Sequence, residues 1–157
     1  MNTYSIKREQ FLPITIDEAW AFFSSAANLS KITPAEMNFT ILTKLTGAPI
    51  SSGMNIEYIV RPLLNIPLHW ITEIKSVNAP FYFKDIQIKG PYALWDHTHT
   101  FETVPGGVKM NDDVQYALPL GILGTIAHSL VVRKKLENIF NFRKTTLEQL
   151  FGKYVAA

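Results

Sequence analysis

The sequence predicts an α+β domain in which a curved antiparallel sheet wraps around a long C-terminal helix. Apolar and polar residues alternate in short segments between Thr3 and Leu118, which indicates seven consecutive strands. After Gly121 the apolar residues recur at spacings of three and four, which is typical of one long amphipathic helix. Such a helix needs an apolar surface to cover, and the sheet supplies one. At 157 residues the chain is most simply a single domain, 1–157.

Two short helices are expected between the first and second strands. The first strand is expected at Thr3–Pro13, where the mixed pattern favours an edge position. Asp17 is a candidate N-cap for a short helix at Glu18–Ser24. A second short helix is expected at Asn28–Ile32, and Pro34 would end it.

The remaining strands follow one another in an antiparallel run. They are expected at Phe39–Leu45, Met54–Arg61, Leu68–Val77, Phe81–Gln87, Trp95–Glu102 and Val108–Leu118. Leu63–Pro67 is read as a connection, and Gly106–Gly107 as the turn of the last hairpin. The apolar stripe of the C-terminal helix consists of Leu136, Ile139, Phe140, Arg143, Leu147, Leu150, Phe151 and Tyr154.

Composition limits the class of protein. A hydrophobic fraction of 47% with 18% charged residues fits a soluble globular domain, and a net charge of +2 gives no footprint for nucleic acid. The absence of cysteine excludes disulfides and thiolate sites. No secretory signal precedes the first strand, so a cytoplasmic location is expected.

Val114–Val132 lacks charged residues, but Pro119, Gly121 and Gly124 interrupt it. The segment therefore predicts a strand, a turn and a helix start without integral membrane association.

Several polar residues fall on faces that should be buried. His97 and His99 share a strand face with large aromatic residues, and the alternation places Asp85 and Asp112 on the inward faces of other strands. Buried polar groups are costly without partners. The pattern therefore predicts either an internal hydrogen-bond network, in which the carboxylates orient the imidazoles, or direct hydrogen bonding to a ligand. Arg143 would pair with Asp85 or Asp112, or its guanidinium would reach solvent at the end of a cavity.

A metal site is a further alternative for this group. Two histidines at positions i and i+2 of a strand point the same way, and nearby carboxylates could complete a coordination sphere. The spacing alone is weak evidence, because convergent ligand geometry is not visible in a sequence. The sequence therefore assigns neither a metal nor a cofactor.

The chain resembles the START-like or SRPBCC superfamily, whose helix-grip fold is that of birch-pollen-allergen-type proteins. The resemblance covers essentially the whole chain and is strongest to small bacterial ligand-binding members, sometimes labelled cell-division-inhibitor-like. The residues that carry it are Asp85, Gln87, Gly90–Pro91, Trp95, His97, His99, Phe101–Glu102, Gly106–Gly107, Met110, Asp112, Tyr116, Leu118–Pro119, Gly121, Leu123–Gly124, Ile139–Phe140 and Arg143. Phe142 is a departure, since relatives often carry Tyr there.

The resemblance implies a cavity between the sheet and the C-terminal helix. That cavity would hold a small hydrophobic or amphipathic molecule, with apolar side chains supplying affinity and polar ones orienting the ligand. The residues expected to contact the ligand are Tyr58, Trp70, Phe83, Asp85, Gln87, Trp95, His97, His99, Met110, Asp112, Tyr116 and Arg143.

Three functional interpretations follow. The first is a binding protein, acting in transport or sensing as a monomer or weak homodimer. The second is an enzyme of the polyketide cyclase or dehydratase type, with His97, His99 and Asp112 in acid/base roles. No nucleophile elbow, phosphate loop or HExxH motif names a reaction. The third treats the apolar turn Leu118–Leu123 as a contact surface for a partner or a membrane.

Overall fold

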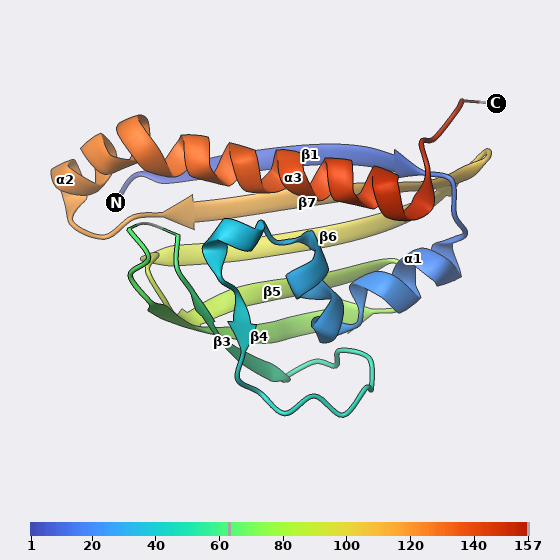
Figure 1. Ribbon diagram of the computed structural model, residues 1–157, viewed down its shortest axis with the longest axis horizontal. Helices are drawn as coiled ribbons and strands as arrows, with labels where there is room; N and C mark the ends of the chain where they lie inside the picture. Colours follow the sequence, from blue (N-terminus) through green and yellow to red (C-terminus); the bar gives the residue numbers. More distant parts are fainter. Residues whose placement is uncertain (63, 157) are drawn as a thin grey trace.

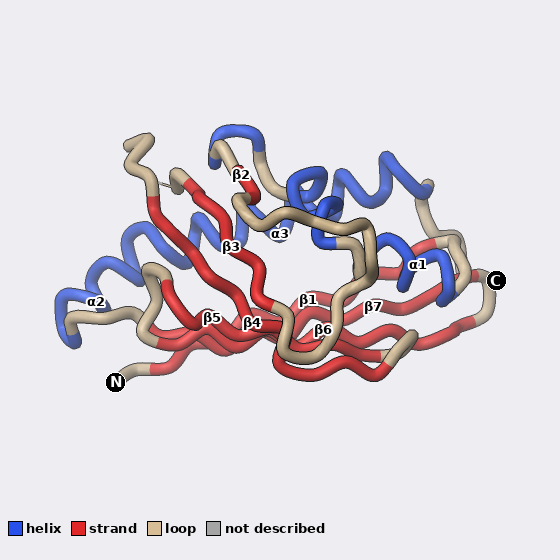
Figure 2. The backbone as a smooth tube through the Cα atoms, turned by 90° about the horizontal axis from the view of Figure 1, so that it is seen from below, coloured by secondary structure: helices blue, strands red, loops and turns tan. Residues whose placement is uncertain are grey.

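A computed structural model describes residues 1–62 and 64–156 of the chain, with the backbone alone at 124 and 129. Leu63, in the expected connection, and Ala157, the last residue of the expected domain, lie outside the described residues. The described chain forms a seven-stranded sheet in the order β1-β7-β6-β5-β4-β3-β2, and every pairing is antiparallel. The helices lie over one face of this curved sheet, and the longest crosses it beside β1 and β7 (Figures 1 and 2).

The strands agree with the predicted run. Their bounds are β1 Thr3–Leu12, β2 Thr40–Ile41, β3 Asn55–Val60, β4 Leu68–Asn78, β5 Tyr82–Lys89, β6 Leu94–Val104 and β7 Gly107–Ala117. β1 stands at the edge of the sheet, as predicted. The strand expected at Phe39–Leu45 is shorter, because the amides of Leu42 and Thr43 share the single carbonyl of Glu57 and the regular ladder ends there. Two register shifts in the pairing of β4 with β5 add to the bend of the sheet.

The segment between β1 and β2 contains one more helical turn than predicted. Its elements are α1 Ile16–Phe23, η1 Ala26–Ile32 and η2 Ala35–Met37. The N-cap of α1 is Thr15, so the prediction of Asp17 was wrong. Thr15 Oγ1 accepts from the Glu18 amide at 3.2 Å, and the Glu18 carboxylate accepts from the Thr15 amide at 2.7 Å. This reciprocal pair satisfies two amides, whereas Asp17 lies inside the first turn.

The C-terminal helical segment comprises α2 Gly121–Ala127, the π-helical turn η3 His128–Val132 and α3 Arg133–Phe151, which follow one another without a break (Figure 1). The predicted apolar stripe is buried along α3 at Leu136, Phe140, Arg143 and Leu147. Tyr154 was predicted to continue the helix, but the helix ends at Phe151. Gly152 has a φ of 93°, and Tyr154 Oη then donates to the Pro105 carbonyl at 2.6 Å.

The inward faces of the strands are those that the alternation predicted. His97, His99 and Phe101 are buried on β6, and Met110 and Asp112 are buried on β7. The segment Val114–Val132 is the end of β7, a turn and the start of the helical segment, as expected. Across the described residues, no helix combines the length and the apolar character needed to cross a membrane.

Candidate functional site

A cavity lies between the sheet, η1 and α3. Its volume is about 210 Å³, and most of its lining is apolar or aromatic. Residues of β3, β4, β5 and β6 form the wall on the sheet side, and α3 forms the wall opposite. Eight residues from the sequence-based set line this cavity: Tyr58, Trp70, Phe83, Asp85, Trp95, His97, His99 and Arg143.

Four residues of that set lie outside the cavity lining found among the described residues. Met110 is 2% exposed and packs in the core, and Tyr116 bonds to His128, with 2.8 Å between Oη and Nε2. Gln87 bonds through its amide to the Tyr92 carbonyl at 2.7 Å and accepts from the Tyr92 amide at 3.1 Å. Asp112 contacts the two cavity histidines from β7. Gln87 thus holds the Tyr92 segment, and Tyr92 itself lines the cavity.

Sequence reasoning missed several cavity residues. They include Phe22, Phe23, Leu29, Phe39, Tyr92, Ile139 and Phe140. Ile139 and Phe140 belong to the apolar stripe next to Arg143, so the helical period was a usable signal. The others lie on short helices and connections, where no periodic pattern tells which way a side chain points.

A polar cluster, defined here as Asp85, His97, His99, Asp112 and Arg143, forms one part of the site. Three adjacent strands bring it together, because Asp85 on β5 pairs with His97 and Asp112 on β7 pairs with His99. His97 Nε2 lies 2.8 Å from Asp112 Oδ1, and His99 Nε2 lies 2.9 Å from Asp85 Oδ2. His99 Nδ1 is also 3.0 Å from Asp112 Oδ1, but without the alignment of a hydrogen bond. The predicted carboxylate–imidazole network is therefore present.

Arg143 reaches this network from α3. Its Nη1 lies 3.5 Å from Asp112 Oδ1, and its guanidinium carbon is 4.9 Å from the centre of the Phe140 ring. The side chain is only 11% exposed, so the alternative in which it extends to solvent was wrong. A buried guanidinium requires a partner charge, and Asp112 supplies it.

The two imidazoles have opposite pKa shifts. Burial lowers the pKa of His97, and the neighbouring His99 lowers it further. Burial also acts to lower the pKa of His99, but its two carboxylate neighbours, Asp112 and Asp85, outweigh that effect and raise it. His99 therefore takes up a proton more readily than His97.

The carboxylates of the cluster are held ionised. Burial acts to raise the pKa of Asp112, but the hydrogen bond from His97, the close approach of His99 and the charge of Arg143 hold it well below its usual range. The same balance lowers the pKa of Asp85, where His99 is the strongest opposing partner. With Asp85 and Asp112 negative and Arg143 positive, the cluster has a net charge of −1 when both imidazoles are neutral, and uptake of a proton by His99 brings it to zero. Electrostatic compensation of this kind makes its burial tolerable.

The cavity wall also contains donors without partners among the described residues. Trp70 Nε1 and Arg143 Nε are both buried and unbonded there, and both residues line the cavity. Tyr58 Oη, in contrast, is 3.1 Å from Thr72 Oγ1. Burial raises the pKa of Tyr58, so its hydroxyl remains protonated. Buried donors without a partner are uncommon in folded proteins, and a bound molecule is one means of satisfying them.

Comparison with known proteins identifies the fold. No family model matches the chain, and no curated protein matches it. Among solved structures, Ara h 8.0201 is 14% identical and superposes with a TM-score of 0.59, covering 94% of this chain and 99% of its own. Ms6760 from Mycobacterium smegmatis is 12% identical, with a TM-score of 0.65 over 96% of this chain and 98% of its own. CV1439 from Chromobacterium violaceum is 10% identical, with a TM-score of 0.71 over the same shares, 96% and 98%.

At these identities the similarity concerns the fold alone. The protein has a helix-grip fold, in which a curved antiparallel sheet surrounds a long C-terminal helix. That fold is the one of the START-like or SRPBCC superfamily, as the sequence resemblance predicted. The narrower likeness to the small bacterial subgroup stays a prediction.

Proposed function

We propose that the protein binds a small hydrophobic or amphipathic molecule in the cavity between the sheet and α3. The observation that carries the proposal is a cavity of about 210 Å³ whose mostly apolar lining includes a group of ionisable side chains, Asp85, His97, His99 and Arg143. Burial of apolar surface favours binding but does not fix the orientation of the ligand, whereas a localised polar group does. Transport or sensing of the molecule would be the role of such binding.

The volume of the cavity limits the size of the ligand. Drug-sized ligands occupy pockets of roughly 300–1,000 Å³, while a cavity of about 150 Å³ is enough for benzene. At about 210 Å³ the cavity favours a molecule of one or two rings, or a short chain. The buried N–H groups of Trp70 and Arg143 favour a ligand that carries an acceptor oxygen at its polar end.

The proposal can be tested by filling the cavity. Val60 lines the cavity from β3, and its neighbour Ile59 is directed to the other face of the strand. Val60→Phe should abolish binding of 2-naphthoic acid, and Ile59→Phe should leave it unchanged. Binding is measured by quenching of tryptophan fluorescence, because Trp70 and Trp95 both line the cavity.

Native mass spectrometry of the protein as purified gives a second measurement, in which a bound molecule appears as added mass that is lost on denaturation. Equal affinity of Val60→Phe and Ile59→Phe for naphthoic acid would place the ligand elsewhere and overturn the proposal. So would a bare polypeptide mass together with no saturable quenching.

Acid/base catalysis is the second candidate function, and one observation favours it. His97 lines the cavity, burial lowers its pKa, and its Nδ1 lies 3.8 Å from Asp85 Oδ2, beyond hydrogen-bond distance. A neutral imidazole nitrogen in an apolar cavity can accept a proton from a bound substrate. His97→Gln separates the two functions, since it would abolish turnover by a cyclase or dehydratase but only weaken binding by a carrier.

A further inference from the structure

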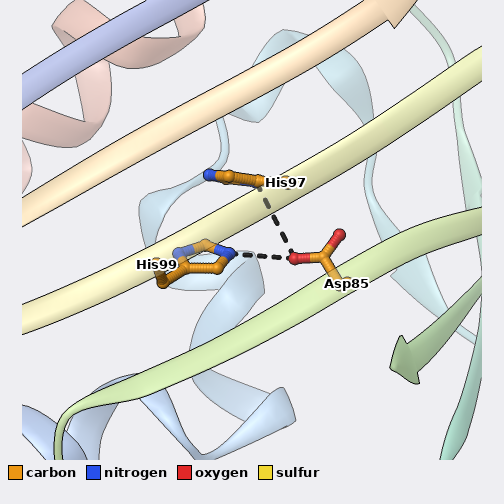
Figure 3. A group of neighbouring side chains, drawn as sticks. All are labelled: Asp85, His97 and His99. Atoms are coloured by element: carbon orange, nitrogen blue, oxygen red, sulfur yellow. Dashed lines mark hydrogen bonds and ion pairs between the residues drawn. The ribbon is translucent and has the colours of Figure 1, made fainter. Parts of the chain in front are cut away.

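The two histidines of the polar cluster each direct one nitrogen toward Asp112 and the other toward Asp85. His97 Nε2 and His99 Nδ1 lie 2.8 and 3.0 Å from Asp112 Oδ1. His97 Nδ1 and His99 Nε2 lie 3.8 and 2.9 Å from Asp85 Oδ2. Figure 3 shows the last two contacts converging on one carboxylate oxygen. Asp85 Oδ2, His97 Nδ1 and His99 Nε2 thus form an inner set of donor atoms. Asp112 is the outer carboxylate, which lies behind both rings.

We propose that Asp85, His97 and His99 bind a divalent transition-metal ion. One donor atom from each residue lies within 4.8 Å of the other two. Metal bonds of about 2.0–2.2 Å place neighbouring ligand atoms roughly 3–3.5 Å apart, so the separations of 2.9 and 3.8 Å need only small adjustments. Two imidazoles and one carboxylate are a donor set suited to zinc or non-haem iron and unsuited to magnesium or calcium.

The sheet holds these ligands in place. His97 and His99 are two residues apart on β6, so both point to the same face, and Asp85 is the direct cross-strand neighbour of His97. Ligands on paired strands are positioned more accurately than ligands on loops. The ring of Phe83 stacks on His99 at 4.0 Å between centres and limits rotation of that imidazole.

Asp112 has the position of the outer carboxylate that commonly supports metal-bound histidines. A single oxygen, Oδ1, is near His97 Nε2 and near His99 Nδ1. A hydrogen that His97 Nε2 donates to Asp112 leaves the lone pair of His97 Nδ1 free on the side of Asp85, whereas a bound ion would displace the hydrogen that His99 Nε2 donates to Asp85. Arg143 in turn lies 3.5 Å from the same oxygen. The contact behind the His97 ring therefore selects the tautomer that metal binding by His97 requires.

The charges of the cluster favour an additional cation. Asp85 and Asp112 contribute two negative charges and Arg143 one positive charge, so neutral imidazoles leave a net charge of −1. A divalent ion would change this value to +1, and an anionic oxygen on the remaining side of the ion would restore neutrality. Buried charges are tolerated when they are balanced in this way.

The ion would be accessible from the cavity. Asp85, His97 and His99 all line it, and three protein ligands leave at least one coordination position open. The inference rests on the proposed binding function and extends it: the polar end of the ligand would be a carboxylate, enolate or phenolate oxygen that completes the coordination of the metal.

Titration of the tag-free protein with Co²⁺, after removal of bound metal by chelator, tests the site. The wild-type protein should bind one ion with visible absorption bands of a nitrogen- and oxygen-ligated cobalt centre. Asp112→Asn should weaken binding by about 10–100-fold, as for other supporting carboxylates, and Asp85→Asn by more. His69→Gln is the matched control. His69 pairs with Glu57 on the other face of the sheet, so its replacement should leave Co²⁺ binding unchanged.

A second measurement covers the case in which Asp85→Asn fails to fold. In ¹⁵N-histidine-labelled wild-type protein, Zn²⁺ should shift His97 Nδ1 and His99 Nε2, while His69 and His128 stay unchanged. Absence of stoichiometric Co²⁺ and Zn²⁺ binding would overturn the inference and leave a proton-bridged network only. Shifts at His69, or equal loss in His69→Gln and Asp85→Asn, would also overturn it. Binding of naphthoic acid to the metal-free protein would keep the binding function distinct from this outcome.

Discussion

The polar cluster and α2 both depart from the usual distribution of residues. The cluster buries ionisable side chains, and α2 exposes large apolar ones. In the cluster His97, His99 and Asp112 are 5%, 7% and 5% exposed, while Ile122 and Leu123 of α2 are 81% and 65% exposed. Buried charges and exposed large apolar side chains are both informative departures. They differ in how the departure is accommodated. The charged members of the cluster lie close to oppositely charged partners, so each member depends on the others, whereas the exposed side chains of α2 contribute little burial to the fold.

The largest expected effect comes from removing the carboxylate shared by the cluster. Asp112→Ala would leave His97, His99 and Arg143 without their common partner, and uncompensated buried charge costs about 3–5 kcal/mol. We expect the free energy of unfolding to fall by about that amount in urea denaturation. The matched control is Asp113→Ala, which removes a 40% exposed carboxylate that lies 3.1 Å from Lys7 on the other face of β7.

The control should lose no more than about 1 kcal/mol, because exposed ion pairs contribute little. A similar loss for Asp112→Ala and Asp113→Ala would mean that the cluster does not depend on its shared carboxylate. Such a result would mean that the buried carboxylate contributes no more to stability than an exposed ion pair.

The second prediction tests α2 against α3 within the same C-terminal helical segment. Leu147 of α3 is fully buried, at 0% exposed, and Ile122 of α2 is 81% exposed. Leu147→Ala should lower the free energy of unfolding by about 2–5 kcal/mol through lost burial and a residual cavity. Ile122→Ala should change it by less than about 0.5 kcal/mol, as expected for a surface position.

Both variants are measured by urea denaturation at the same protein concentration. A loss above about 1 kcal/mol for Ile122→Ala would show that α2 is covered in solution, for example by a second copy of the chain. The unchanged value expected here is compatible with the interpretation of Leu118–Leu123 as a contact surface for a partner or a membrane.

How far the sequence predicts each region depends on how local the interactions are. Period-two alternation placed His97, His99 and Asp112 on inward faces, and consecutive antiparallel strands made their contact with Asp85 foreseeable. The arrangement of nitrogens around two carboxylates was not foreseeable, because it depends on rotamers and on register at the level of single residues. Which of the network, ligand and metal interpretations applied therefore stayed open in the sequence.

The cavity and α2 were harder to predict for different reasons. Gln87 was expected to contact the ligand, but its amide bonds to the Tyr92 backbone. Tyr92 itself reaches the cavity from a connection that has no periodic pattern. Leu29 and Phe39 are likewise placed by tertiary packing. The change of period after Gly121 predicted a helix there, but a local pattern does not tell that the apolar side chains of α2 remain exposed.

His128 connects the C-terminal helical segment to β1 and β7 and provides the smallest predicted effect. It begins η3, directly after α2, and is buried between Tyr116, whose Oη is 2.8 Å from its Nε2, and the stacked ring of Tyr4. Burial lowers the pKa of His128, and the charge of Arg133 on α3 lowers it further. In the unfolded chain the pKa is about 6.5, so the unfolded state binds the proton first as the pH falls.

His128 therefore contributes stability that is fully present above about pH 6.5 and is lost as the pH falls toward its native pKa. In His128→Gln this titration is absent, so the stability difference between wild type and variant should shrink from pH 7.5 to pH 5, by at most about 1.4 kcal/mol per pH unit. Urea denaturation at several pH values measures it, and the other histidines largely cancel in the difference. A difference that stays constant with pH would mean that His128 is solvated, and that α2 and η3 are not fastened to the sheet through a buried, neutral imidazole.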